Sequence, residues 1–392
     1  MDDDPASSKP TAVQSEGVPG DDSVPLIATK TQVPRRRPDL LPRQRLVDYV
    51  HSHLDRKLLL ISAPAGFGKT SLLADFAADT ELPVCWYTLD AFDQDVSVFL
   101  EYLISAIARR FPAFGGRSRA LLRQATDPGR HLHPLVATLV QEIYDTIPEY
   151  FCLVLDDHHT VEPQEQINEF LDLFVTYVDE NCRLIVASRT LPALPNLSLL
   201  VARRQAAGLS IDELRFTASE IGALALQNYG LTLSPEQAGL LVQRTGGWIT
   251  GLLLTAIPGW ERAQPEIPSG GQIGADLYDY FRRQVLDQQA APVRRFLLTS
   301  SVLDELSPEL CAAVLDIDRP ASLIDELRSR SLFLIEYEGD ATRLRYHDLF
   351  RDFLQSYLRR QDETLFRELT RRAAGAYASR GEWDRAVGRY LD

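Results

Sequence analysis

The chain has 392 residues and a formal net charge of −14, with 45% apolar and 24% charged residues. This length predicts two to four domains rather than one, and the apolar fraction is sufficient to form buried cores. The acidic balance argues against a protein that covers nucleic acid over a broad surface, because phosphate backbones are bound by clustered Lys and Arg.

The first segment in chain order is residues 1–34, an acidic tail rich in Asp, Ser, Pro and Gly. It has almost no large apolar residues to offset its ordering entropy, so we expect disorder. The start "MDDDPASSKP" also lacks the apolar core of a signal peptide, and no apolar run in the chain reaches membrane-spanning length. We therefore expect a soluble, cytoplasmic protein without membrane contact.

Residues 35–215 alternate short apolar runs with segments of helical periodicity. The runs predict strands at 58–62, 84–89, 150–157 and 183–189, and helices are expected at 69–78, 96–111, 134–147 and 165–178. Continuous apolar strands separated by helices are typical of a parallel sheet with helices on both faces. The fold class predicted here is an α/β phosphate-loop domain of the doubly wound kind.

The strand signals stop after residue 215. Residues 216–274 predict a small helical domain and a Pro/Gly linker, with Thr217 and Glu220 forming a capping box and Ser234 capping a second helix before Pro235. Residues 275–362 predict helices and a hairpin around Gly339-Asp340, a combination typical of a winged-helix domain. Residues 363–392 have the Ala, Tyr, Gly and Trp spacing of one unit of an α-helical repeat arm.

The four cysteines are scattered along the chain, and three of them lie in apolar runs. They are Cys85, Cys152, Cys182 and Cys311. This distribution favours reduced core thiols over a disulfide framework or a zinc site.

The stretch "KLLLISAPAGFGKTSLL", residues 57–73, carries the clearest chemistry. It follows the phosphate-loop pattern G-x-x-x-x-G-K-[ST] except that Ala63 replaces the first glycine. The predicted strand, loop and helix are the context that this motif requires. Lys69 would reach the β- and γ-phosphates, the Thr70 hydroxyl would bind Mg²⁺, and Ser71 would contact the α-phosphate. The backbone N–H groups that would cradle the phosphates belong to Ala65, Gly66, Phe67, Gly68, Lys69 and Thr70.

The third predicted strand ends in "LVLDDHH". Asp156 would hold Mg²⁺ through water, and Asp157 would orient or deprotonate an attacking water. Arg189, at the end of the next strand, would lie beside the γ-phosphate and stabilise charge during transfer. His158 and His159 are adjacent and point in different directions, so we expect packing or loop roles for them rather than a metal site.

These motifs together resemble the STAND class of signalling ATPases, and most closely the large ATP-dependent, LuxR-type bacterial regulators of the maltose-activator type. The similar segments are "SAPAGFGKTSL", "WYTLDAFDQD", "TGGWITGLLL" and "RYHDLFRDFL", and they occur in the family's order. The resemblance covers residues from about 33 to the end. It implies a switch related to NB-ARC proteins, closed with ADP and opening to self-associate with ATP, with slow hydrolysis that resets it.

The resemblance also implies further site residues. His347 in "YHD" would contact the ADP β-phosphate from the winged-helix domain, although Tyr346 replaces the family's usual Met. Trp248 would pack near adenine, Arg43 would lie near the nucleotide, and Leu41 would flank the base. The ligands expected are therefore ATP or ADP with Mg²⁺, and an unknown inducer or protein would act on C-terminal regions.

Two other functions stay open at this point. One is a non-hydrolysing scaffold that holds nucleotide as a structural ligand, and the other is a phosphate-loop metabolic kinase. The arginines of "PRRRP" keep a local nucleic-acid patch possible, but the acidic wing "EYEGDAT" is a poor DNA reader. We therefore expect no direct DNA binding by this segment.

Overall fold

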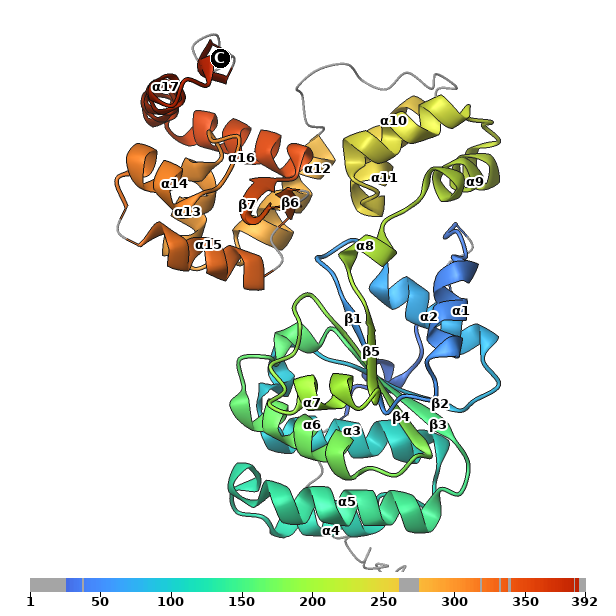
Figure 1. The fold of residues 1–392 in the computed structure, drawn as a ribbon. Helices are drawn as coiled ribbons and strands as arrows, with labels where there is room; N and C mark the ends of the chain where they lie inside the picture. The colour runs from blue at the N-terminus through green and yellow to red at the C-terminus, as the bar shows by residue number, and fades with distance from the viewer. Residues whose placement is uncertain are drawn as a thin grey trace, which may run out of the picture.

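The structure is a computed structural model. It describes residues 26–36, 39–260, 275–317, 319–330, 333–337, 340–383 and 385–387. Residues 1–25 of the predicted tail, linker residues 261–274, the hairpin turn at 338–339 and the last five residues lie outside the described residues. The disorder predicted for the whole of residues 1–34 is wrong for residues 26–34, because Lys30 is buried in a 3₁₀ turn and paired with Asp93 of the sheet domain. Figure 1 shows a sheet domain below, with a helical unit and a second, mixed unit side by side above it.

Within the described residues, five parallel strands form the sheet in the order β2-β3-β4-β1-β5. The strands are β1 (Leu58–Ser62), β2 (Val84–Thr88), β3 (Phe151–Asp156), β4 (Cys182–Ser188) and β5 (Ala206–Leu209). The four predicted strands are confirmed with shifts of at most one residue at either end. The edge strand β5 was not predicted.

Neighbouring residues of each strand pack into two different hydrophobic clusters. Leu59 and Ile61 of β1 belong to one cluster, whereas Leu58 and Leu60 belong to the other. This alternation follows from the two-residue side-chain period of a strand, and it explains why both faces need apolar residues. The predicted doubly covered parallel sheet is confirmed.

Helices cover both faces of the sheet. Those packed with the first cluster are α1 (Gln44–Ser52) and α2 (Lys69–Asp79). Those packed with the second are α3 (Val96–Arg110), α4 (Gly116–Gln124), α5 (Leu132–Thr146), α6 (Glu165–Tyr177) and α7 (Leu197–Ala202). Short 3₁₀ turns occur at Ala28–Thr31, Ala91–Gln94, Pro128–His131 and His158–Thr160, and α8 (Ile211–Leu214) leads out of the domain.

The helical unit contains α9 (Ala218–Tyr229), α10 (Pro235–Thr245) and α11 (Ile249–Trp260). The capping box between Thr217 and Glu220 is present at the start of α9, and Ser234 caps α10 before Pro235. These caps satisfy N–H groups that have no partner within the helix. The unit has its own small core, which includes Phe216 and Leu252.

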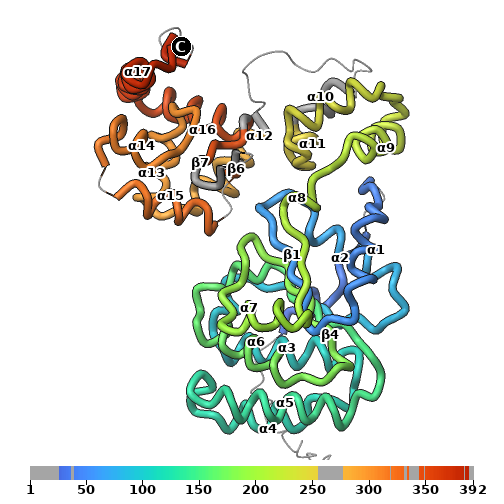
Figure 2. The backbone as a smooth tube through the Cα atoms, viewed as in Figure 1, coloured from blue at the N-terminus to red at the C-terminus, as the bar shows by residue number. Residues whose placement is uncertain are grey.

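The second unit contains helices and a two-stranded antiparallel sheet. Its elements are α12 (Ala275–Phe281), one π-helical turn (Arg282–Leu286), α13 (Ala291–Ser300), α14 (Pro308–Leu315), α15 (Pro320–Ser329), β6 (Leu334–Tyr337), β7 (Asp340–Tyr346) and α16 (Asp348–Gln361). The predicted hairpin is confirmed by the pairing of β6 with β7. Figure 2 shows that this unit lies beside α11 and above the sheet.

The helix α17 (Glu363–Ser379) packs against α14 and α16 of the same unit. The hydroxyl of Tyr377 accepts a hydrogen bond from the backbone N–H of Asp304 at 2.8 Å. The prediction that this segment begins a repeat arm remains a prediction. The four cysteines are buried and unpaired, and none of the described helices is long and apolar enough to cross a bilayer.

Candidate functional site

The loop between β1 and α2 has the backbone shape that the glycine pattern predicts. Gly66 and Gly68 both have φ of +81°, a left-handed conformation that favours glycine. Gly68 caps α2, and a Cβ added there would meet no atom within 4 Å, so the space beside it is open. Ala63 is buried and does not have a positive φ, so alanine is accommodated where the pattern has glycine.

Lys69 begins α2 and is only 7% exposed. Its ammonium group donates to the carbonyl oxygens of Ala63 at 2.6 Å and Pro64 at 3.1 Å. Burial lowers the pKa of Lys69 to about 8, with Asp157 opposing and Arg189 reinforcing the shift. The side chain is therefore a cation at pH 7 that lies within its own loop, at the start of a helix.

The two acids after β3 differ in their surroundings. Asp156 is 1% exposed, and burial followed by the neighbouring Asp157 raises its pKa to about 6, while a hydrogen bond from the Thr70 hydroxyl opposes the shift. Asp157 has φ of +60° and its carboxylate is 43% exposed. The pairing of Thr70 with Asp156 places a hydroxyl and a carboxylate together beside Lys69.

Two cavities flank the loop. The first, the helical-side cavity, has a volume of about 630 Å³. Its lining includes Leu41, Arg43, Gly68, Ser71, Leu72, Asp75, Phe216, Ile249 and Leu253. The predicted residues Leu41, Arg43 and Ser71 are therefore brought together here, with apolar side chains from the helical unit opposite them.

Arg43 has a mainly structural set of contacts. Its guanidinium donates to the carbonyl oxygens of Leu214 at 2.9 Å and Arg215 at 2.7 Å, pairs with Glu220, and lies over the ring of Phe216. Burial lowers its pKa, and Glu220 opposes that effect. Arg43 thus fixes the chain that leaves the sheet domain against the helical unit, at the wall of the cavity.

The second, the winged-side cavity, has a volume of about 690 Å³ and lies at the other end of the loop. Its lining includes Pro64, Ala65, His159, Glu162, Arg189, Gln284, Gln288, Arg330 and Phe333. Arg189 donates to the carbonyl oxygen of Gln284 at 3.3 Å and to the side chain of Gln288 at 3.1 Å. The predicted arginine therefore bridges the sheet domain and the second unit.

His159 and Glu162 are residues of this cavity that the sequence analysis did not assign to the site. The Nδ1 atom of His159 lies 3.7 Å from the carboxylate of Asp157. Burial, then the charges of Arg189 and Lys69, lowers the pKa of His159 to about 3, so the imidazole is neutral. The only feature of the sequence that could have pointed to His159 was its position two residues after Asp157. His158 is fully buried, in keeping with the packing role predicted for it.

Trp248 and His347 both make hydrogen bonds within the protein, and their predicted contacts with nucleotide remain predictions. Trp248 is fully buried behind the loop, where its Nε1 donates to the carbonyl oxygen of Ala65 at 3.0 Å. It does not line the helical-side cavity, where Ile249 supplies the apolar surface instead. The Nε2 of His347 lies 2.7 Å from the carbonyl oxygen of Thr245, at the end of α10. Trp248 is covered by Phe281 and Phe333 of the second unit, whereas His347 belongs to that unit and reaches across to the helical unit.

The residues present fit a magnesium nucleotide. No group of three or more His, Cys, Asp or Glu in the described part of the chain could hold a metal by itself. A magnesium nucleotide requires fewer protein ligands than that, because Mg²⁺ keeps several waters and binds substrate phosphates together with one or two protein ligands. Thr70 and Asp156 meet that need at the start of α2, where N–H groups and the helix dipole favour anions.

Residues 282–366 match the family model described as the MalT winged helix domain. This chain is MalT-like. The HTH-type transcriptional regulator MalT of Yersinia pestis (strain Pestoides F) is 30% identical over 337 residues, which cover 84% of this chain and 36% of that protein. The predicted resemblance and the predicted winged-helix domain are confirmed, and the second unit is called the winged-helix domain below.

This chain is also similar to a protein whose name describes a kinase and not a transcriptional regulator. The serine/threonine-protein kinase PknK of Mycobacterium tuberculosis (strain CDC 1551 / Oshkosh) is 29% identical over 381 residues, covering 96% of this chain and 34% of that protein. The chain thus spans about a third of either relative. A Walker-type ATPase of Pyrococcus abyssi has the same fold, with a TM-score of 0.51, 15% identity, and coverage of 81% of this chain and 97% of that chain.

Proposed function

We propose that this MalT-like chain is the nucleotide-responsive core of a signalling regulator, which binds ATP or ADP with Mg²⁺. The observation that carries the proposal is the position of the loop between two cavities. One cavity is bordered by the helical unit and the other by the winged-helix domain. A nucleotide seated on the loop would therefore contact a different domain at each end, which is what a nucleotide-dependent switch requires.

The helical-side cavity would take the adenosine. Leu41, Ile249 and Leu253 offer apolar surface for the base, and Ser71 lies where the α-phosphate would sit. Lys69 would exchange its two loop carbonyls for β- and γ-phosphate oxygens. Thr70 and Asp156 would hold Mg²⁺, which neutralises phosphate charge when bound.

Hydrolysis would occur at the winged-side cavity. Asp157, next to Asp156 and with an accessible carboxylate, would orient or deprotonate the water. Arg189 would stabilise charge on the γ-phosphate, and the neutral His159 would supply a further hydrogen-bonding group on the same wall. We propose that turnover is slow and that its role is to reset the switch.

Arg189 suggests how the γ-phosphate would open the protein. At present it donates to Gln284 and Gln288 of the winged-helix domain. A γ-phosphate would compete for this cation and weaken the contact, whereas ADP would leave it in place. We propose that the ADP form is closed, and that ATP, with an inducer acting on other regions, favours an open form that self-associates.

The relatives differ in what their names say they do, one a transcriptional regulator and the other a protein kinase. We propose that the same nucleotide core serves different outputs, and that the output of this protein is transcriptional as in MalT. A metabolic kinase would instead show rapid turnover with a small acceptor. A scaffold would hold ADP, show no turnover, and assemble identically with ADP and ATP.

The direct test is to denature the purified protein and identify any released nucleotide by chromatography. We expect about one ADP per chain, and gel filtration after exchange into ATP should show larger assemblies. A protein that releases no nucleotide, and that also fails to bind ATP or ADP in titration calorimetry, would contradict the proposal.

The pKa of Lys69 predicts a pH dependence of binding. Its pKa of about 8 without phosphate lies below that expected beside phosphate oxygens, so binding above pH 8 requires proton uptake. Affinity should change little through this group below pH 8 and fall by up to about tenfold per pH unit above it. Titrations at pH 7, 8 and 9 measure the slope. A Lys69→Arg variant that still binds should lose it, because arginine does not titrate in this range.

His347→Ala should release ADP faster. The imidazole joins the start of α16 to the carbonyl oxygen of Thr245, so it fastens the winged-helix domain to the helical unit. Loss of one hydrogen bond corresponds to roughly a five- to tenfold change. Stopped-flow displacement of a fluorescent ADP measures the rate, with His131→Ala in the sheet domain as a control. An unchanged rate would show that the hydrogen bond from His347 to Thr245 does not slow the release of ADP.

A further inference from the structure

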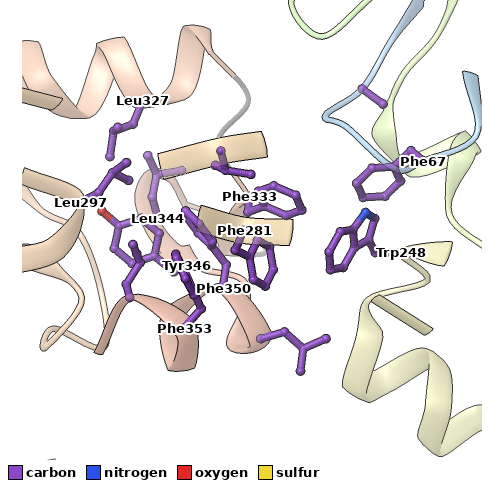
Figure 3. Packing of buried hydrophobic residues seen from close by; sticks show 14 of the residues in the cluster. Phe67, Trp248, Phe281, Leu297, Leu327, Phe333, Leu344, Tyr346, Phe350 and Phe353 are labelled. Carbon is purple, nitrogen blue, oxygen red and sulfur yellow. The ribbon is translucent and has the colours of Figure 1, made fainter. Parts of the chain in front are cut away.

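Trp248 joins the phosphate loop to the winged-helix domain. Its indole is completely buried, and its Nε1 donates to the carbonyl oxygen of Ala65 at 3.0 Å. The other side of the ring stacks on Phe281 with centroids 5.2 Å apart and meets the edge of Phe333 at 5.1 Å. Figure 3 shows the indole between Phe67 of the loop and these two rings, with its nitrogen on the loop side.

The next carbonyl of the loop is also held by this segment. The backbone N–H and hydroxyl of Thr250 donate to the carbonyl oxygen of Gly66 at 3.3 and 3.1 Å. Two successive loop carbonyls are therefore held by the start of α11. In a trans peptide the C=O and the following N–H point to opposite sides. Holding the carbonyls of Ala65 and Gly66 toward α11 thus aims the N–H groups of Gly66 and Phe67 the other way.

The loop and Trp248 are closely packed at Gly66. A Cβ built on Gly66 would lie 2.7 Å from Nε1 of Trp248, closer than real Cβ atoms approach a neighbour. A shift of the indole would therefore shift the loop, or else break its hydrogen bond. This position of the indole depends on what covers its outer side.

That cover comes from the winged-helix domain. Phe281 ends α12 and Phe333 precedes β6, and both are buried in one continuous cluster that also contains Phe67 and Trp248. Tyr280 adds a third ring at 5.6 Å from the indole. Without these rings the outer side of the indole would lose its apolar cover, so docking of this domain favours the position that holds the loop.

We propose that Trp248 is a positioning residue that couples docking of the winged-helix domain to the shape of the phosphate loop. Nucleotide affinity then depends on that docking through the indole, and bound nucleotide stabilises docking by the same factor. This inference rests on the proposed nucleotide binding and names the part of the chain that regulates it. No contact between Trp248 and the base is required.

The test measures ADP affinity by titration calorimetry in four proteins: wild type, Trp248→Phe, Tyr280→Ala and the double variant. Trp248→Phe keeps an aromatic ring and loses the N–H, so affinity should fall about five- to tenfold. Tyr280 lines neither flanking cavity, yet Tyr280→Ala should weaken ADP severalfold. In the double variant the Tyr280 effect should largely disappear, because its route to the loop is already lost.

The matched control is Tyr278→Ala. Tyr278 is on the same helix but packs on Phe353 and Tyr357. It should leave ADP affinity unchanged, whereas a general effect of loosening the domain would weaken binding here too. If Trp248→Phe does not fold, Thr250→Val removes one donor to Gly66 without altering the aromatic cluster and should weaken ADP severalfold.

Tryptophan emission gives an independent readout, since Trp248 is one of four tryptophans. ADP should change the emission of the wild type and leave Trp248→Phe almost unchanged. Additive effects of Trp248→Phe and Tyr280→Ala, or unchanged affinity in Trp248→Phe and Thr250→Val, would overturn the coupling while nucleotide binding stands. A wild-type protein that binds no nucleotide would overturn both the coupling and the proposed function.

Discussion

Lys69→Ala should bind MgATP at least about 100-fold more weakly than the wild type. A hydrogen bond to a charged group contributes about 1.5–3 kcal/mol, so the loss of bonds to the β- and γ-phosphates corresponds to about two orders of magnitude or more. The protein should still fold, because the variant removes a cation whose burial is unfavourable, as its pKa of about 8 indicates. Titration calorimetry measures the affinity, and a thermal melt checks folding.

Lys57→Ala is the matched control for this prediction. Lys57 lies just before β1 and donates to the carbonyl oxygen of Val178 at 2.8 Å, away from both cavities. Its loss removes the same charge from the same domain and should change MgATP affinity by less than about threefold. Equal effects of the two substitutions would show that Lys69 acts through net charge alone, and this would contradict its assignment to the phosphates.

Asp157→Asn should reduce ATP hydrolysis by roughly 10²- to 10⁴-fold, the range expected when a general base is removed. MgATP affinity should change little, because Thr70 and Asp156 remain to hold Mg²⁺. Asn is the suitable substitution, since φ at this position is +60° and Asn tolerates the left-handed region. Phosphate release under single-turnover conditions measures the rate, and a filter-binding assay measures the affinity.

Asp316→Asn provides a control with the same backbone conformation. Asp316 caps α14 with φ of +49°, is exposed, and belongs to the winged-helix domain away from the loop. It should leave hydrolysis unchanged. Asp157→Ala is a poorer probe, because alanine in this conformation costs about 1–2 kcal/mol in strain. Hydrolysis at the wild-type rate in Asp157→Asn would show that another group, such as His159, activates the water.

The strands that were predicted from the sequence are those whose own residues form an apolar run and so indicate burial on both faces. β3 is buried along its whole length and apolar up to Leu155, because both faces of the sheet are covered, and such a run is typical of a strand in a parallel sheet. The helix starts at Thr217 and Ser234 were equally local, because a cap and its partner three residues later form one hydrogen-bonded unit.

The edge strand β5 shows where this reasoning stops. Its residues, Ala206–Leu209, include two alanines and a glycine, which have low strand propensity. It is a strand because it pairs with β1, and Gly208 suits the close approach there, since an added Cβ would lie 3.0 Å from the carbonyl oxygen of Leu60. A pairing between segments about 150 residues apart leaves no periodic signal.

The residues of the site also fall into those that a local motif predicts and those that only tertiary packing places. The phosphate loop, Lys69, Thr70 and the two acids were predicted because each motif lies within a few residues of a strand end, where parallel strands bring their loops together. His159 was missed because its position in the winged-side cavity depends on the direction in which its short 3₁₀ turn faces, and the sequence does not indicate that direction. Trp248 was predicted to pack near adenine, and no local signal in the sequence indicates the hydrogen bond from its indole to Ala65 of the loop.

The sequence alone therefore determined the loop between a strand and a helix, the residues that follow the strand ends, and the covered parallel sheet, since these depend on short motifs and on side-chain period. Only the tertiary structure decided what contacts the loop from outside. The winged-helix domain lies more than 200 residues from the loop along the chain, yet its Phe281 and Phe333 cover the indole that donates to Ala65. Contacts of that kind depend on how separately folded surfaces pack, and a pattern within one segment carries no information about its partner.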